Sequence, residues 1–164
     1  MKKAQIQGQV FIYILTLIIT AGILLYGYNA IKVINENANQ VELVNFKDAL
    51  KQDFEKMSSD YGSSKTETYN VPSKIKKICF YQTGEEPLFR AMPRDLNPLI
   101  IDSIKDETGN NVFLVFNDGG FDQMNFGRIE ISNEDYNMIC IEPSGNRLKL
   151  RLEGLGDGVL VERG

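Results

Sequence analysis

One long uncharged segment near the N-terminus constrains this chain more than any other feature. Residues 4–31 contain no charged side chain, and residues 10–28 are apolar except for two threonines and two glycines. At about 1.5 Å per residue, a helix over residues 10–28 spans roughly 28 Å, close to the ~30 Å hydrocarbon core of a bilayer. The sequence therefore predicts a membrane-spanning helix. This predicted span includes Val10, Ile14, Leu17, Ile18, Leu24 and Tyr28.

The charges that flank the span predict its orientation. Lys2 and Lys3 precede it, whereas only Lys32 is close on the other side and Glu36 soon follows. Because positively charged flanks stay in the cytoplasm, we expect a single-pass protein with a cytoplasmic N-terminus and its C-terminal part outside the cell membrane. A removable secretory signal is the competing interpretation, but its apolar region is normally ~7–15 residues long and ends in a small-x-small site.

A second helical pattern continues beyond the span. Neither proline nor glycine occurs between Gly27 and Gly62, so one helix can extend over residues 9–57. The amphipathic part covers residues 33–57, and we expect a bend or loosening over the Asn-rich residues 35–40. The apolar residues of this part follow the 3.6-residue period of one helix face, at Leu43, Phe46, Leu50, Phe54 and Met57.

The rest of the chain, residues 58–164, shows the two-residue period of β-strands. Residues 147–153 alternate strictly between charged residues and leucine. We expect further strands at residues 74–82, 112–117 and 126–132, an edge strand at 66–71, a surface loop over 84–98, and a three-stranded meander over 137–162. The predicted fold class is α+β, with a long N-terminal transmembrane and amphipathic helix followed by a small antiparallel β-rich head domain.

The chain has two cysteines, and both lie inside predicted strands of the head domain. Because this domain is expected outside the cytoplasm, a disulfide between Cys79 and Cys140 is plausible, and two buried thiols are the alternative. A bridge that closes a loop of about 60 residues stabilises by roughly 4 kcal/mol in the chain-entropy model.

Composition argues against several classes of function. The chain has no histidine, which removes the commonest general base near neutral pH, so we expect neither catalytic residues nor a cofactor or zinc site. Residues 58–164 hold 17 acidic and 12 basic side chains, which argues against a nucleic-acid partner. The oxygen-rich residues 117–125 and Asp157 are interpreted as turns rather than ion ligands, and the lysines at 74, 76 and 77 as a solvated strand face.

A short basic tail and a Gly-Gln pair, Gly8 and Gln9, stand directly before the apolar segment. This arrangement resembles the class III signal peptide of archaeal type IV pilin-like proteins. The resemblance implies that a prepilin-type signal peptidase cuts between Gly8 and Gln9 and leaves the apolar helix in the mature protein. Ala4 and Gln5, after Lys3, form an alternative site. The implied organisation is a leader at 1–8, a helix at 9–57 and a head domain at 58–164.

The same resemblance implies a function. Type IV pilins bundle their apolar helices into a filament core and display their heads outside, so we expect partners among copies of this chain or other pilin subunits, in the membrane or in an extracellular filament. The alternative is an unprocessed, membrane-anchored exodomain protein, such as an adhesin or an accessory envelope subunit, that does not polymerise. A third possibility, a tethered module that binds a small ligand, needs an apolar cleft.

Overall fold

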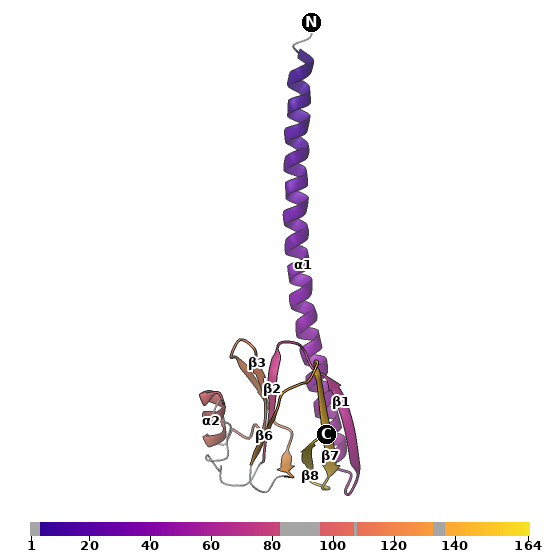
Figure 1. Ribbon diagram of the computed structural model, residues 1–164, viewed down its shortest axis with the longest axis vertical. Helices are drawn as coiled ribbons and strands as arrows, with labels where there is room; N and C mark the ends of the chain where they lie inside the picture. Colours follow the sequence, from indigo (N-terminus) through magenta and orange to yellow (C-terminus); the bar gives the residue numbers. More distant parts are fainter. Residues whose placement is uncertain (1–3, 83–95, 107, 133–136) are drawn as a thin grey trace. The chain divides into compact units, whose positions relative to one another are not determined.

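A computed structural model describes four stretches of the chain. It divides into two compact units, Met1–Val41 and Glu42–Gly164, which we call the N-terminal and C-terminal units. Helix α1 (Ala4–Ser58) begins in the first unit and ends in the second (Figure 1). The described residues are 4–82, 96–106, 108–132 and 137–164.

Helix α1 confirms the helix predicted from the sequence. It continues through residues 35–40, where a bend or loosening was expected, and it ends at Ser58. Gly62 follows with a φ of 75°, a conformation that glycine adopts without steric cost. The turn that follows Ser58 is closed by the Asp60 N–H, which donates to the Met57 carbonyl at 3.0 Å. The chain can therefore reverse direction and enter the first strand.

The C-terminal unit contains two four-stranded sheets. Sheet A has the order β1-β7-β8-β5, and sheet B has the order β4-β3-β2-β6. Neighbouring strands are antiparallel except for β5 and β8, which are parallel. The strands of sheet A are β1 (Ser64–Asn70), β7 (Arg147–Gly154), β8 (Gly158–Arg163) and β5 (Arg128–Ile131). The strands of sheet B are β4 (Phe121–Met124), β3 (Val112–Phe116), β2 (Ile75–Tyr81) and β6 (Met138–Ile141).

Most strand predictions are confirmed, and one is wrong. Strands β1 and β3 take the predicted edge and central positions, and β7 shows the predicted alternation of exposed and buried side chains. The expected meander over 137–162 is wrong, because β6 joins β2 in sheet B while β7 and β8 lie in sheet A. Strand β4 and helix α2 (Pro98–Lys105) were not predicted, and most of the expected loop over 84–98 lies outside the described residues.

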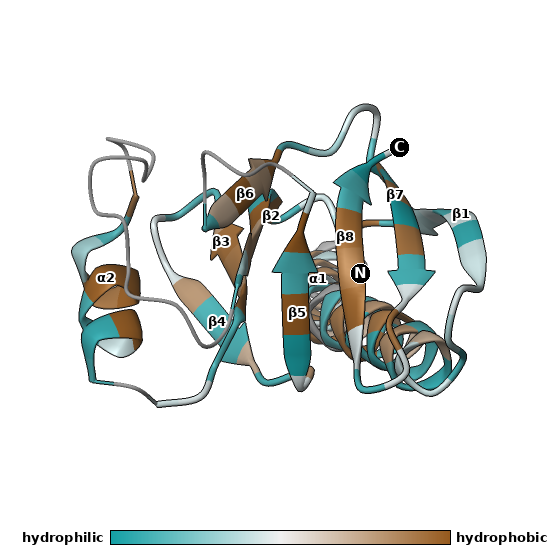
Figure 2. Cartoon of the chain, turned by 90° about the horizontal axis from the view of Figure 1, so that it is seen from below, coloured by the Kyte–Doolittle hydropathy of each residue, from teal (hydrophilic) through white to brown (hydrophobic). Residues whose placement is uncertain are grey.

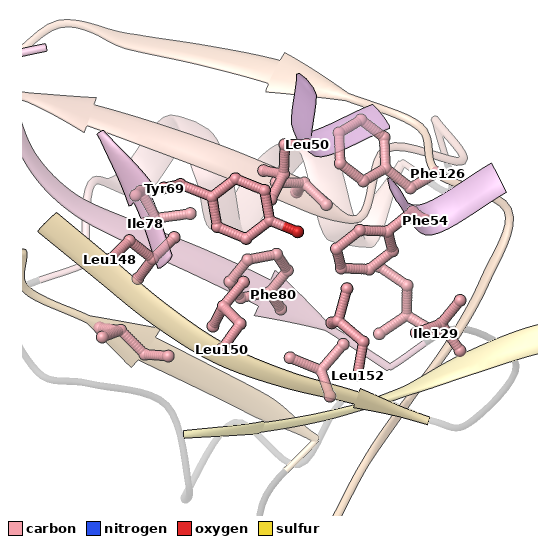
Figure 3. Packing of buried hydrophobic residues seen from close by; sticks show 14 of the residues in the cluster. Leu50, Phe54, Tyr69, Ile78, Phe80, Phe126, Ile129, Leu148, Leu150 and Leu152 are labelled. Carbon is pink, nitrogen blue, oxygen red and sulfur yellow. The ribbon is translucent and has the colours of Figure 1, made fainter. Parts of the chain in front are cut away.

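The main core lies between helix α1 and the two sheets. The predicted apolar stripe of α1 provides it: Leu50 and Phe54 are fully buried, and Leu43 packs against the cluster. The Phe54 ring stacks on Phe80 of β2 with centroids 5.8 Å apart and meets Phe126 at 5.0 Å (Figure 3). The 42–58 segment of α1 is therefore an integral part of the C-terminal unit.

A second, smaller core lies on the opposite face of sheet B. Along β2, Ile78 and Phe80 belong to the main core, whereas Cys79 and Tyr81 belong to the second one, as the two-residue period of a strand requires. Helix α2 covers this face with Ile100 and Ile104, and Figure 2 shows it on the far side of sheet B from sheet A. Burial on both faces explains the continuous apolar sequence of β3.

Candidate functional site

The candidate functional site is the apolar part of α1 in the N-terminal unit. Within the described residues, one helix, Gln9–Ser58, is long and apolar enough to cross a membrane. Its apolar side chains find no partner inside the unit: Leu17 is 71% exposed and Leu24 is 68% exposed. Val10, Ile14, Ile18 and Tyr28 are exposed as well. Such a surface is stable only in lipid or against other apolar surfaces.

Two threonines inside this segment hydrogen-bond their hydroxyl groups to backbone carbonyls of the same helix. The Thr16 hydroxyl donates to the Ile12 carbonyl at 2.6 Å, and the Thr20 hydroxyl donates to the Thr16 carbonyl at 2.8 Å. Because the helix backbone accepts these bonds, neither hydroxyl requires water. The small side chains on this face leave a shallow groove, of the kind that allows close helix packing in membranes. The groove is lined by Tyr13, Thr16, Leu17, Thr20, Ala21 and Leu24.

The two predicted processing sites lie at the start of α1. The helix begins at Ala4, so the backbone of Gln5, Gly8 and Gln9 is helical, and the side chain of Gln9 is exposed. The side chains of residues 1–8 lie outside the described part of the structure. Cleavage at Gly8 or at Ala4 stays a prediction from the sequence.

The two cysteines are brought together by strand pairing. Cys79 on β2 and Cys140 on β6 are direct partners in the antiparallel register, with Cα atoms 4.0 Å apart, and they form a disulfide. The bridge ties β6, an edge strand, to the interior strand β2 over a sequence separation of 61 residues. Cys79 is fully buried in the second core.

A polar cluster joins α1 to β1 in the C-terminal unit. The Tyr69 hydroxyl donates to the Asp53 carboxylate at 2.7 Å, and the Lys65 ammonium lies 3.4 Å from the same carboxylate and 2.7 Å from Glu67. Burial, and then the hydrogen bond to Asp53, raise the pKa of Tyr69 far above its ordinary value. The pKa of Lys65 is also raised, chiefly by Glu67. Both shifts favour the protonated forms, so Tyr69 and Lys65 remain the donors in their contacts with these carboxylates.

Sequence reasoning did not find this cluster, although one signal was present. Asp53 directly precedes the buried Phe54, so it lies at the border of the apolar stripe. Helix α2 also had a signal: Asn97 stands before Pro98, and its side chain accepts from the Leu99 N–H at 3.0 Å as a helix cap.

The remaining sequence candidates have structural roles. Residues 117–120 form the β3–β4 turn, and Asp122 pairs with Lys47 of α1 at 2.7 Å. Among the described residues, no group of three or more acidic or cysteine side chains is placed to hold a metal ion. Asp157, in the turn between β7 and β8, pairs with Arg128 at the start of β5 at 2.6 Å. The prediction of a solvated lysine face is wrong for Lys77, which is buried beside an irregularity in the β2–β3 register.

No protein-family model, curated protein or solved structure matches this chain. The described residues offer an apolar helix that is long enough to cross a membrane and a folded β unit built around the end of that same helix.

Proposed function

We propose that this chain is a type IV pilin-like surface subunit. In this proposal the apolar half of α1 first holds the chain in the cell membrane, with the N-terminus in the cytoplasm and the C-terminal unit outside. The same apolar helix then assembles with helices of other copies or of related subunits into a pilus or pilus-like structure. A prepilin-type signal peptidase processes the chain between Gly8 and Gln9.

One observation carries the proposal: α1 contains both an exposed apolar segment and a segment buried in the β unit's core, without a break in the helix. Its residues 10–28 are exposed and apolar, whereas Phe46, Leu50 and Phe54, further along the same helix, form the centre of the β unit's core. A head domain linked to its anchor by a flexible segment has no need of such continuity. In a filament, a helix that belongs to the head core transmits load directly from the head to the packed apolar helices.

Two further observations support an extracytoplasmic C-terminal unit. The Cys79–Cys140 disulfide is of a kind that persists in oxidising compartments. Lys2 and Lys3 precede the apolar segment, in agreement with a cytoplasmic N-terminus. Both observations also suit the alternative function, an anchored exodomain protein that does not polymerise, so processing is the property that separates the two.

The decisive experiment is the intact mass and N-terminal sequence of the chain after co-expression with a prepilin-type signal peptidase. We expect a mature chain that begins at Gln9, and a Gly8→Leu variant that keeps Met1 because the peptidase requires a small residue before the cut. An Ala4→Leu variant is the matched control and should be processed normally. A wild-type chain that keeps Met1 favours the permanently anchored alternative, and a chain that begins at Gln5 moves the site to Ala4.

A further inference from the structure

Among the described residues, no strand pairs with the outer edge of β1 in sheet A. Strand β1 pairs with β7 on its other side. It is seven residues long and contains no proline and no register irregularity. Figure 2 shows it at the end of the sheet, beyond β7. Strands of this kind readily accept another strand unless their edge is guarded.

The ladder geometry identifies which backbone groups face outward. Gly164 donates its N–H to the Lys149 carbonyl at 3.2 Å, so Lys149 of β7 bonds toward β8 and not toward its β1 partner Thr68. At the end of β1, the Val71 N–H donates to the Asn146 carbonyl at 2.8 Å. Because bonding alternates along an antiparallel ladder, the even-numbered residues of β1 direct their N–H and C=O groups away from β7. These residues are Ser64, Thr66, Thr68 and Asn70.

Two charged side chains restrict which strand can use this edge. Lys65 and Glu67 lie on the strand face that points toward α1, and their side chains remain 40% and 37% exposed. Lys65 and Glu67 pair with each other at 2.7 Å within the strand. Charges in these positions normally protect an edge, because an apolar incoming strand removes water from them and offers no opposite charge in return. A strand that brings a carboxylate opposite Lys65 and an ammonium opposite Glu67 removes this obstacle.

We infer that the matching strand is β1 of a second copy of this chain, paired antiparallel with Thr66 opposite Thr66. In this register Lys65 of each copy lies opposite Glu67 of the other. Two pairs of opposite charges therefore form across the contact. Ser64 lies opposite Thr68, which places hydroxyl side chains together on the other face. A register shifted by one step, with Glu67 opposite Glu67, brings like charges together and is disfavoured.

The contact is a two-fold, self-complementary interface of a small, transient class. It continues sheet A from one C-terminal unit into the next through the outward groups of Ser64, Thr66 and Thr68. The two units run in opposite directions, because a two-fold axis reverses a strand that pairs with itself. The inference does not depend on cleavage at Gly8 and is independent of the proposed function.

Site-directed cross-linking of the full chain in detergent tests this register. In a Thr66→Cys variant the two new cysteines face each other with Cα atoms about 5.5 Å apart, within disulfide reach. Mild oxidation should convert most of the chain to a covalent dimer on a non-reducing gel. The matched control is Thr68→Cys. In the proposed register the two new cysteines lie four residues apart along the strands, about 13 Å, so this variant should form no covalent dimer. Equal cross-linking of both variants, or of neither, overturns the inference.

A proline variant tests the backbone contact without a new cysteine. Thr66→Pro removes an N–H that points away from β7, so sheet A keeps its own ladder. In sedimentation equilibrium, we expect at least a tenfold lower association constant for Thr66→Pro than for the wild-type chain. Intact Cys79–Cys140 bridges and an unchanged circular dichroism spectrum show that the fold is kept. Unchanged association of the folded variant excludes pairing through β1, whatever the N-terminal sequence of the chain proves to be.

Discussion

The Tyr69 hydroxyl donates a 2.7 Å hydrogen bond to the carboxylate of Asp53, which joins β1 to the inner face of α1. The Tyr69 side chain is itself part of the main core (Figure 3). The bond therefore fixes the end of sheet A against the helix at a point where apolar packing alone has no directional preference. Lys65 reaches the same carboxylate and balances its charge.

Removing the Tyr69 hydroxyl should weaken the C-terminal unit. We expect Tyr69→Phe to lower the free energy of unfolding by about 1–2 kcal/mol, because a hydrogen bond to a charged group contributes roughly 1.5–3 kcal/mol and Asp53 is partly exposed. Chemical denaturation of the full chain in detergent measures the change. Tyr61→Phe is the matched control, since Tyr61 is 82% exposed and no hydrogen bond of its hydroxyl is found in the described structure. Equal stability of both variants and the wild type contradicts the role assigned to Asp53.

The same contact predicts a dependence of stability on high pH. The pKa of Tyr69 is raised from the ordinary value of 10.0, first by burial and then by Asp53. The unfolded chain therefore releases the phenol proton at a lower pH than the folded chain, and the stabilisation is complete below pH 10 and is lost as the pH rises above it. We expect the advantage of the wild type over Tyr69→Phe in denaturation midpoints to shrink as the pH rises above about 10. The raised pKa of Lys65 has the same sign but occurs in both proteins.

Gly154 should tolerate no side chain. A Cβ atom at this position would overlap the backbone carbonyl oxygen of Met57, in the last turn of α1, and that of Asp60, in the turn after the helix. We expect Gly154→Ala to lower the free energy of unfolding by about 3 kcal/mol or more, because the turn and the end of β7 must separate. Gly120→Ala is the control, since its Cβ would meet side-chain atoms rather than backbone, the Asp118 carboxylate at 3.1 Å and the Phe116 ring at 3.5 Å. A small and equal loss in both variants means that the turn adapts.

The parts of the fold that follow from local periodicity could be predicted from the sequence. Leu50 and Phe54 repeat at the spacing of one helix face, and Leu148, Leu150 and Leu152 repeat at the spacing of one strand face. Each pattern is produced by one element packing against one core, so it appears in consecutive residues. The helix, the β-rich unit and most strands could therefore be predicted from the sequence alone.

Strand partners depend on residues far apart in the chain, and periodicity does not record them. The turn residues 144–146 predict that the strand containing Cys140 pairs with β7, whereas this strand pairs with β2 and brings Cys140 to Cys79. The Asp53 cluster was missed for a similar reason, since Tyr69 reaches Asp53 only after the chain reverses at Gly62. Helix α2 is short, and it begins at Pro98, where the proline-rich residues 84–98 predict a loop rather than a helix.

The exposed apolar half of α1 gives the last prediction. A charge at Leu17 or Ile18 should prevent the chain from staying in the membrane, because a charged residue at the centre of a span costs about 2.5–3.5 kcal/mol. Leu17 is 71% exposed, so Leu17→Arg disturbs no packing inside the chain and acts only on the surroundings of the helix. We expect the variant to shift from the alkali-resistant membrane fraction to the soluble or degraded fraction. Leu17→Ala should stay in the membrane.

A second control tests whether a new charge removes the chain from the membrane only when it lies within the predicted span. Val44 is also exposed, at 53%, but it lies on α1 beyond the predicted span and inside the C-terminal unit. Val44→Arg should therefore remain in the membrane fraction as well as the wild type does. If Leu17→Arg remains there too, the apolar segment is held by protein partners rather than by lipid. If both arginine variants are lost, the effect is one of expression or folding and the assigned span is not supported.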